Sequence, residues 1–259
     1  MDINKYNQKA WDREVQRDNP WTQPVDSQTI AAAREGKWNV VLTPTRPVPH
    51  DWFGDVAGKR ILCLASGGGQ QAPILAAAGA NVTLLDQSPA QLAQDALVAA
   101  REGLDIEIVE GDMAKLSMFK AGSFELIFHP VSNCFVPDVE PVWKEAHRVL
   151  KSNGVLLSGF ANPMLYLFDR DELDPQKQRI VNSLPYSDLE DLDDDRRRDL
   201  IAKEEPLEWS HTLDDQIGGQ LAAGFIITGF YEDLHPGHPL AEWLPTMIAT
   251  RALKGKKRK

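Results

Sequence analysis

The residues with the clearest chemical meaning are a glycine cluster and an acid that follow two successive apolar runs. Gly67–Gly69 comes directly after the run Ile61–Leu64, and Asp86 ends the next apolar run. This order is typical of a strand, a tight turn, a helix and a second strand. In such a unit the glycines let the backbone approach a ligand closely, and the acid accepts hydrogen bonds from ribose hydroxyls. The sequence therefore predicts a site for a ligand that carries a ribose.

A second acid occurs at the corresponding place after a third apolar run. Residues 106–110 lead into Gly111-Asp112-Met113. Ligands of doubly wound sheets bind outside the carboxyl ends of the strands, so we expect Asp86 and Asp112 to face the same site. A glycine cluster alone often marks only a tight turn, but the three segments together favour a binding site.

Charge and cysteine content narrow the class of protein. The 259 residues carry a formal net charge of -10, which disfavours a nucleic-acid partner. Neither Cys63 nor Cys134 lies in a CxxC pair, so we expect no metal site and no disulfide framework. The first residues do not resemble a signal peptide, and no apolar run approaches the roughly 20 residues that span a bilayer. We therefore expect a cytoplasmic protein without a membrane partner.

Regular alternation of strand-like and helix-like segments begins at Gly58. We expect strands at residues 60–65, 82–86, 106–110, 125–129, 154–160, 225–232 and 246–253. We expect helices at residues 70–78, 89–101, 139–150 and 212–223. Apolar strands with intervening helices predict an α/β fold with a doubly wound parallel sheet. The last two strands have no helix-length connection, so we expect them to pair antiparallel.

The chain divides into four segments. Residues 1–57 are rich in Trp, Pro and Asn and form an N-terminal arm, or lid. Residues 58–162 form the cofactor-binding half of the core. Residues 163–211 interrupt the regular pattern with a run of acids followed by arginines, and we interpret them as an insertion that contributes to the substrate pocket. Residues 212–259 supply the C-terminal helix, the last strands and a basic tail.

Several segments in the correct order resemble the class I S-adenosylmethionine-dependent methyltransferase superfamily, in particular its small-molecule methyltransferases. The resemblance covers roughly residues 58–254. The glycine loop matches at Gly67 and Gly69, and residues 86–92 match the family's Asp-x-Ser-x-x-Met-Leu. Residues 145–156 match the family's helix and turn before the fifth strand. The resemblance implies a seven-stranded, mostly parallel, Rossmann-like methyltransferase fold, with helices between the first six strands and an antiparallel last strand.

The resemblance also implies S-adenosylmethionine as the cofactor and assigns residues to it. Asp86 would take the ribose hydroxyls, Asp112 would take the adenine amino group, and Met113 would pack on the adenine ring. The residues expected to contact the cofactor are Ala65, Ser66, Gly67, Gly69, Asp86, Gln87, Gln91, Asp112, Met113, His129, Tyr6 and Trp11. The family's acid before the loop is replaced by Cys63, and its first glycine by Ala65. That acid commonly helps to hold the methionine amino group, so another group must take this role.

The implied activity is transfer of a methyl group to an oxygen, nitrogen or sulfur atom of a small-molecule acceptor. The sulfonium methyl is already activated, so the main tasks are alignment of the acceptor and exclusion of water. A hydroxyl acceptor benefits from a base, and His129 and His211 are the candidates. Structural roles stay open for both: His129 could shape the turn after its strand, and His211 could simply precede the last helix.

The N-terminal arm carries two aromatic residues that suit a lid. Tyr6 and Trp11 lie on a helix expected over residues 4–17, and packing against the core is an equally good interpretation. His235 and His238 lie in a Pro-Gly loop without a nearby cysteine or acid pair, so we interpret them as a poor metal site.

Two other functions fit parts of the pattern. A non-catalytic S-adenosylmethionine-binding protein is compatible with the substitution at Cys63. A nicotinamide-dependent oxidoreductase is compatible with the glycine loop and Asp86, but the chain has no Tyr-x-x-x-Lys pair and that function leaves Gly111-Asp112-Met113 unexplained. The identity of the acceptor and the oligomeric state are not indicated by the sequence.

Overall fold

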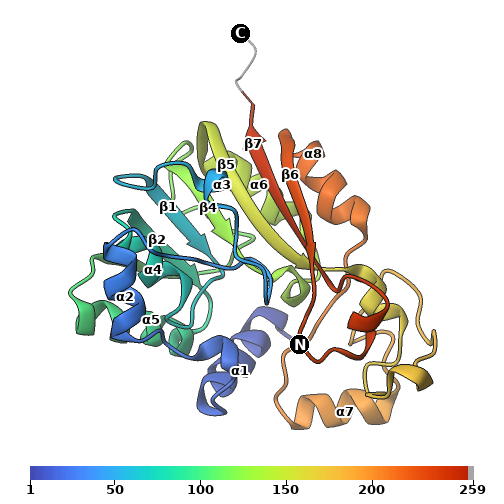
Figure 1. The fold of residues 1–259 in the computed structure, drawn as a ribbon. Coiled ribbons are helices and arrows are strands. Elements are labelled where there is room, and N and C mark those ends of the chain that lie inside the picture. The colour runs from blue at the N-terminus through green and yellow to red at the C-terminus, as the bar shows by residue number, and fades with distance from the viewer. Residues whose placement is uncertain (256–259) are drawn as a thin grey trace.

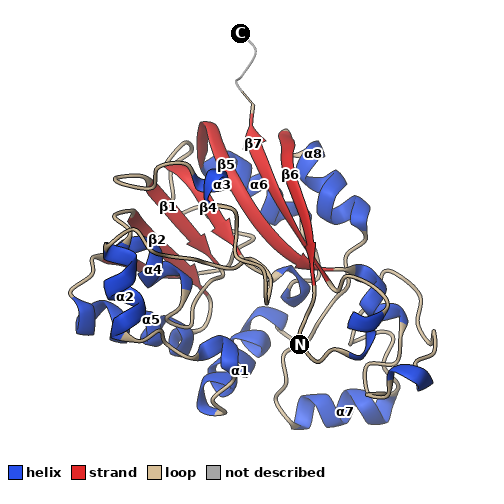
Figure 2. Ribbon diagram, viewed as in Figure 1, coloured by secondary structure: helices blue, strands red, loops and turns tan. Residues whose placement is uncertain are grey.

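One sheet of seven strands lies at the centre of the molecule, with helices on both faces (Figures 1 and 2). The computed structural model describes residues 1–255. The strands are β1 Arg60–Leu64, β2 Asn81–Asp86, β3 Ile106–Glu110, β4 Phe124–His129, β5 Leu150–Ala161, β6 Phe225–Asp233 and β7 Met247–Lys254. Their order is β3-β2-β1-β4-β5-β7-β6, and β7 runs antiparallel to both of its neighbours. This arrangement confirms the predicted doubly wound fold with an antiparallel last strand.

The helices pack on two buried layers of side chains. They are α1 Ile3–Gln16, α2 Ser27–Arg34, α3 His50–Phe53, α4 Gln71–Ala77, α5 Pro89–Glu102, α6 Glu140–Val149, α7 Asp194–Ala202 and α8 Gly219–Ala222. Because strand side chains alternate between faces, Ile61 and Cys63 enter the layer shared with α2, α4 and α5. Leu62 and Leu64 enter the opposite layer, which is shared with α6. Burial on both faces is what a parallel sheet of this kind requires.

Helix α5 is fixed at both ends by its local sequence. The Ser88 Oγ accepts a hydrogen bond from the Gln91 backbone N–H at 3.1 Å, and Pro89 occupies the first turn. At the other end Gly103 takes the left-handed conformation with φ of 64°, which ends the helix. The Gly68 backbone N–H also approaches the Gln91 carbonyl oxygen, at 3.2 Å. These contacts place the first turn of α5 directly beside the glycine cluster.

Some expected elements differ from the structure. The helix expected at residues 212–223 is present, but its first part, Asp214–Gly218, is a π-helix that continues directly into α8. A side chain at Gly219 would lie 2.7 Å from Trp143 Cδ1, so this glycine permits close packing against α6. The connection from β3 to β4 contains turns and no helix, contrary to the implied pattern. Strand β5 begins at Leu150 because α6 leads straight into it.

Helix α1 lies at the carboxyl edge of the sheet and joins the core to the insertion (Figure 1). The Asp12 Oδ1 accepts a hydrogen bond from the Ser88 Oγ at 2.6 Å, which ties α1 to the start of α5. The Asn7 Nδ2 donates to the Leu207 carbonyl oxygen at 3.0 Å on the other side. The N-terminal arm therefore contacts both halves of the molecule.

The insertion, residues 163–211, has little regular structure. It contains short 3₁₀ turns at Pro163–Leu167 and Pro175–Lys177, followed by α7. The division of the chain into four segments stays a prediction, and most of the expected basic tail lies outside the described residues. Within residues 1–255, no helix combines the length and the apolar character needed to cross a membrane.

Candidate active site

A cavity of about 970 Å³ opens at the carboxyl edge of the sheet. The loops after β1, β2 and β3 form one side of it, and the insertion with the loop after β6 forms the other. Among the residues expected to contact the cofactor, those that line the cavity are Trp11, Ala65, Ser66, Gly67, Asp86, Gln87, Gln91, Asp112 and Met113. Gly69, Tyr6 and His129 do not line it. The structure thus brings most of the predicted residues together at one edge.

Two carboxylates accept hydrogen bonds from the backbone N–H groups of the glycine cluster. The Gly67 backbone N–H donates to the Asp86 Oδ2 at 3.0 Å. The Gly68 and Gly69 backbone N–H groups both donate to the Asp95 Oδ2, each at 2.9 Å. All three amides are therefore engaged within the protein. Asp95 was missed in the sequence because position 95 lies inside a helix and belongs to no motif at the strand ends.

The engaged amides restrict which ligands the glycine loop accepts. In dinucleotide-binding loops, backbone N–H groups point at the pyrophosphate. Here Gly67–Gly69 direct these groups to Asp86 and Asp95, and two buried acids disfavour an anion placed over the loop. The geometry argues against the nicotinamide-dependent oxidoreductase. It favours a ligand whose group next to the glycine loop is neutral or cationic.

Asp86 lies at the end of β2 with both carboxylate oxygens in use. Its Oδ2 accepts from Gly67 and its Oδ1 accepts from the Ser88 backbone N–H at 3.0 Å. Burial is the largest effect on this group and raises the pKa of Asp86, although the backbone hydrogen bonds oppose it. Each carboxylate oxygen has further acceptor capacity, so Asp86 can hold the loop and still accept from a ligand in the cavity.

Two buried polar atoms in the cavity wall lack partners. Ser66 and Gln91 are each 5% exposed, and the Ser66 Oγ and the Gln91 Oε1 have no hydrogen-bond partner within residues 1–255. Buried polar groups are nearly always paired, so these two atoms indicate a polar ligand. A ribose with an attached base supplies hydroxyl and amino donors of this kind. The wall is therefore chemically suited to an adenosine-containing cofactor.

Asp112 is covered by the N-terminal helix. Its Oδ2 accepts from the Asn4 Nδ2 at 2.9 Å, and its Oδ1 accepts from the Ala114 backbone N–H at 2.8 Å. Asn4 belongs to α1, and its side-chain amide is an N–H donor like the adenine amino group that the resemblance assigns to Asp112. The Asn4 amide and an adenine amino group are therefore both suitable donors to the Asp112 Oδ2.

The two aromatic residues of the arm have different positions. Trp11 lines the cavity and packs edge-on against Phe135, with ring centroids 5.0 Å apart. The Tyr6 hydroxyl donates to the Glu205 carbonyl oxygen at 2.9 Å; Glu205 lines the cavity, but Tyr6 does not. The expectation of a cofactor contact fits Trp11, whereas Tyr6 instead fastens α1 to the insertion.

The two histidines expected to act as bases do not reach the cavity. His129 is 0% exposed, and its Nδ1 and Nε2 lie 2.9 Å from the Leu64 carbonyl oxygen and 2.7 Å from the Asn133 Oδ1. The His211 Nε2 bonds to the Asn133 and Val136 carbonyl oxygens at 3.0 and 2.9 Å. Burial lowers the pKa of both imidazoles. In this geometry neither imidazole lines the cavity, and the hydrogen bonds of both hold the turn after β4, which is the structural alternative.

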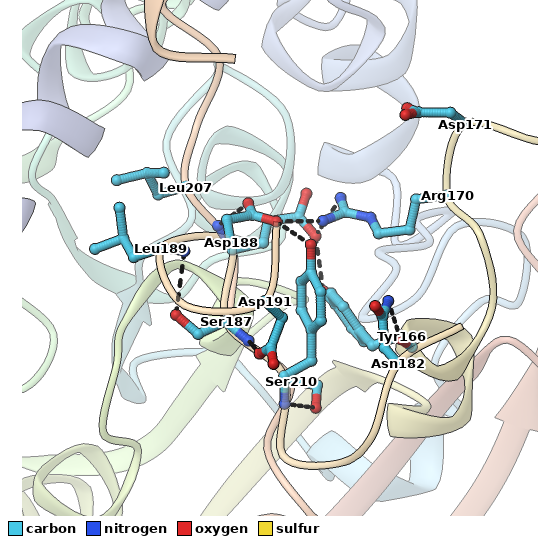
Figure 3. Close-up of polar contacts among 12 residues, drawn as sticks. Tyr166, Arg170, Asp171, Asn182, Ser187, Asp188, Leu189, Asp191, Leu207 and Ser210 are labelled. Carbon is cyan, nitrogen blue, oxygen red and sulfur yellow. Dashed lines mark hydrogen bonds and ion pairs between the residues drawn. The ribbon is translucent and has the colours of Figure 1, made fainter. Parts of the chain in front are cut away.

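The insertion contributes a charged and aromatic cluster that the sequence did not reveal (Figure 3). The Arg170 guanidinium pairs with Asp188 at 3.0 Å and with Glu208 at 2.9 Å. The Tyr186 hydroxyl donates to the Asp188 Oδ1 and the Tyr166 hydroxyl to the Glu208 Oε2, both at 2.7 Å. The five residues are far apart in sequence and follow no period, so no local pattern indicates that they meet.

Two histidines of the Pro-Gly loop after β6 also line the cavity. His235 follows β6, which runs parallel to β5, so it arrives at the same edge as the other loops. Its Nδ1 lies 3.0 Å from the Pro236 carbonyl oxygen, and its ring lies edge-on to Trp21 with centroids 6.1 Å apart. His238 lies 6.3 Å away, measured between ring centroids. Within residues 1–255 no cluster of three or more His, Cys, Asp or Glu side chains is arranged for a metal ion.

Ala65 carries backbone strain that a glycine would remove. Its φ is 48°, in the left-handed region, at the position where the resembling family has glycine. We expect Ala65→Gly to raise the free energy of unfolding by about 1 kcal/mol. Chemical denaturation measures this change. Ala76→Gly in α4 is the matched control and should lower stability by about 1 kcal/mol, because that backbone is helical. A destabilised Ala65→Gly variant would contradict the strain.

Comparison with known proteins agrees with the fold. A family model described as a methyltransferase domain matches residues 62–158. An uncharacterized methyltransferase from Bacillus subtilis, YbaJ, is 51% identical over 249 residues, which cover 96% of this chain and 97% of the relative.

Solved structures share the architecture at low sequence identity. An S-adenosylmethionine-dependent methyltransferase from Mesorhizobium loti superposes with a TM-score of 0.59 at 19% identity, covering 78% of this chain and 94% of the other. The 1,6-didemethyltoxoflavin-N1-methyltransferase from Burkholderia thailandensis, solved with its substrate and S-adenosylhomocysteine, has a TM-score of 0.60 at 13% identity, covering 97% and 88%. Together with the near full-length identity to a methyltransferase, the strand order identifies the chain as a class I S-adenosylmethionine-dependent methyltransferase.

Proposed function

We propose that this enzyme transfers the methyl group of S-adenosylmethionine to an oxygen, nitrogen or sulfur atom of a small-molecule acceptor. The observation that carries the proposal is the two-sided cavity, in which strand-end residues face an enclosed, charged and aromatic wall from the insertion. The Burkholderia enzyme, a 1,6-didemethyltoxoflavin-N1-methyltransferase, supports a small molecule as the acceptor.

The cofactor would occupy the side formed by the strand ends. Asp86 would accept from the ribose hydroxyls, and the Ser66 Oγ and the Gln91 Oε1 would gain partners from the bound adenosine. Asp112 would accept from the adenine amino group, with Met113 packed on the ring. The cofactor supplies an activated methyl group on a sulfonium sulfur when it is bound.

The acceptor would occupy the side formed by the insertion. Asp188 and Glu208 share one arginine, Arg170, so this wall carries more negative than positive charge. Such a wall favours a neutral or cationic acceptor over an anionic one, and it also disfavours a nucleic acid. Tyr166 and Tyr186 line this wall as largely buried rings, and their hydroxyls help to fix the positions of Glu208 and Asp188.

His235 is the residue that we propose as the base in place of His129 and His211. Its Nδ1–H donates to the Pro236 carbonyl oxygen, so the neutral ring keeps its lone pair on Nε2. That nitrogen can take the proton of an acceptor hydroxyl or ammonium. His238 accepts from the Leu240 N–H through its own Nδ1, which leaves its Nε2 as a donor.

Screening small molecules as methyl acceptors tests this function. We expect methylated product, detected by mass spectrometry, with an amine, alcohol or thiol of low molecular mass. His235→Gln should lower the transfer rate to an alcohol or amine acceptor at least about 100-fold while leaving S-adenosylhomocysteine affinity unchanged. His50→Gln is the matched control, since His50 bonds to the Trp38 carbonyl oxygen away from the cavity. Transfer only to RNA, DNA or protein would contradict the proposal.

A further inference from the structure

Asp95 is a carboxylate buried under the glycine loop without a basic partner. It is 0% exposed, and its Oδ2 accepts both the Gly68 and the Gly69 backbone N–H. Its Oδ1 has no hydrogen-bond partner within residues 1–255, and the only charged side chain that acts on it appreciably is another acid, Asp86. A carboxylate in such a place is costly unless its charge is needed.

Capping two backbone amides does not by itself require a charge. The oxygen of a serine, threonine or asparagine accepts the same hydrogen bonds at lower cost. Burial instead raises the pKa of Asp95 to about 7, which is the expected penalty for an acid in this position. The choice of a carboxylate therefore points to an electrostatic task beyond shaping the loop.

Cys63 lies on β1 in the buried layer that also contains side chains of α5, the helix that carries Asp95. Burial is the main cause that raises the pKa of the Cys63 thiol, and the negative charge of Asp95 raises it further. The two side chains therefore interact electrostatically inside the protein. An acid at position 63 would place two carboxylates together, and like charges at close range are unfavourable. The neutral thiol on β1 and the acid on α5 are thus mutually compatible.

The loop can transmit the charge of Asp95 to the cavity. The Gly68 N–H belongs to the same peptide unit as the Gly67 carbonyl, and Gly67 lines the cavity. A carboxylate that accepts the N–H polarises the peptide and makes its carbonyl oxygen a stronger acceptor. A cationic ligand group beside the loop gains from this polarisation, whereas a neutral group gains little.

We propose that Asp95 is the positioning acid of the cofactor site, holding the glycine loop and favouring the cationic ammonium of the methionine portion, in the role that an acid at position 63 would otherwise have. The inference rests on the proposed function, with the cofactor bound on the side of the cavity that Gly67 lines. It assigns to Asp95 on α5 the task of favouring the methionine amino group, which the sequence alone assigned to no residue.

Calorimetric titration of Asp95→Asn tests this role, because asparagine keeps an acceptor for both amides and removes the charge. We expect the affinity for S-adenosylhomocysteine at pH 8 to fall about tenfold, as one unit of pKa coupling corresponds to tenfold in binding. The affinity for adenosine, which lacks the ammonium, should not change. The affinity difference should shrink below pH 6, where Asp95 of the wild-type protein is protonated.

Thermal unfolding distinguishes a positioning role from a merely structural one. Because burial raises the pKa of Asp95, its contribution to stability is complete at low pH and is lost as the pH rises toward about 7. Asp95→Asn should therefore be at least as stable as the wild type at pH 8 while binding more weakly. Equal weakening of stability, adenosine binding and S-adenosylhomocysteine binding would overturn the proposal.

Restoring an acid at position 63 is the matched second variant. We expect Cys63→Asp alone to weaken S-adenosylhomocysteine binding and stability, because it adds a carboxylate beside Asp95. In the Asp95→Asn background the same change should recover most of the lost affinity. A folded double variant as weak as Asp95→Asn would contradict the exchange of positions. If the wild-type protein itself did not bind S-adenosylhomocysteine, the proposed cofactor site would fail instead.

Discussion

Asp86→Ala will lower the affinity of the enzyme for S-adenosylhomocysteine by at least about 100-fold. The carboxylate is the proposed acceptor for two ribose hydroxyls, and hydrogen bonds to an ionised group are worth roughly 1.5–3 kcal/mol each. The same carboxylate holds the Gly67 and Ser88 backbone N–H groups, so its loss also loosens the loop on which the ligand rests. Calorimetric titration with S-adenosylhomocysteine measures the change, with NAD as the comparison ligand.

Asp105→Ala is the control for Asp86→Ala. Asp105 is exposed and lies between α5 and β3, so this variant loses the same charge without touching the cavity. We expect the control to bind like the wild type, and we expect neither protein to bind NAD with comparable affinity. Unchanged affinity in a folded Asp86→Ala variant would show that the ribose is bound elsewhere.

Arg170→Ala will lower the free energy of unfolding by about 3 kcal/mol, the lower end of the range for breaking a buried ion pair. The lower end applies because the Arg170 side chain is 37% exposed, whereas that of Asp188 is only 1% exposed. Without the guanidinium, Asp188 and Glu208 face each other without a cation. Urea denaturation of the variant and the wild type measures the difference.

The pH dependence of Arg170→Ala follows from the same carboxylate. Burial raises the pKa of Asp188 even in the wild type, and Arg170 opposes that rise. In the variant the raised pKa shifts further, so stability is lost as the pH rises and is recovered as Asp188 takes up a proton. The deficit should be smaller at pH 5 than at pH 8. Arg198→Ala, which breaks the exposed pair with Asp195, should change stability by less than about 0.5 kcal/mol at either pH.

The sheet and the side of the cavity formed by the strand ends were predictable because they depend on local patterns. Apolar runs, glycines and acids at strand ends place Asp86 and Asp112 at one edge whatever the surrounding segments do. His129 shows the limit of this reasoning. It ends β4 as expected, yet its side chain enters the buried layer near Trp143, with ring centroids 6.1 Å apart, rather than the cavity.

The side of the cavity formed by the insertion was not predictable from local patterns. Arg170, Asp188 and Glu208 meet through a segment with little regular structure, so no periodicity indicates which charges are buried together. His235 reaches the cavity because β6 runs in the same direction as β5, although the two strands are separated by the antiparallel β7. Asp95 is another long-range case, since its partners Gly68 and Gly69 lie on the far side of a strand and a turn.

The double attachment of α1 has a kinetic consequence. Asp12 and Asn7 fasten this helix to the core and to the insertion, and Asn4 occupies an oxygen of Asp112. We expect the cofactor to enter under α1 and its demethylated product to leave the same way, and each step would then require these ties to break. Association would be limited by helix opening rather than by diffusion, and the opening rate would be the upper limit of the turnover number. The contacts that hold α1 in place would thus also set the residence time of the product.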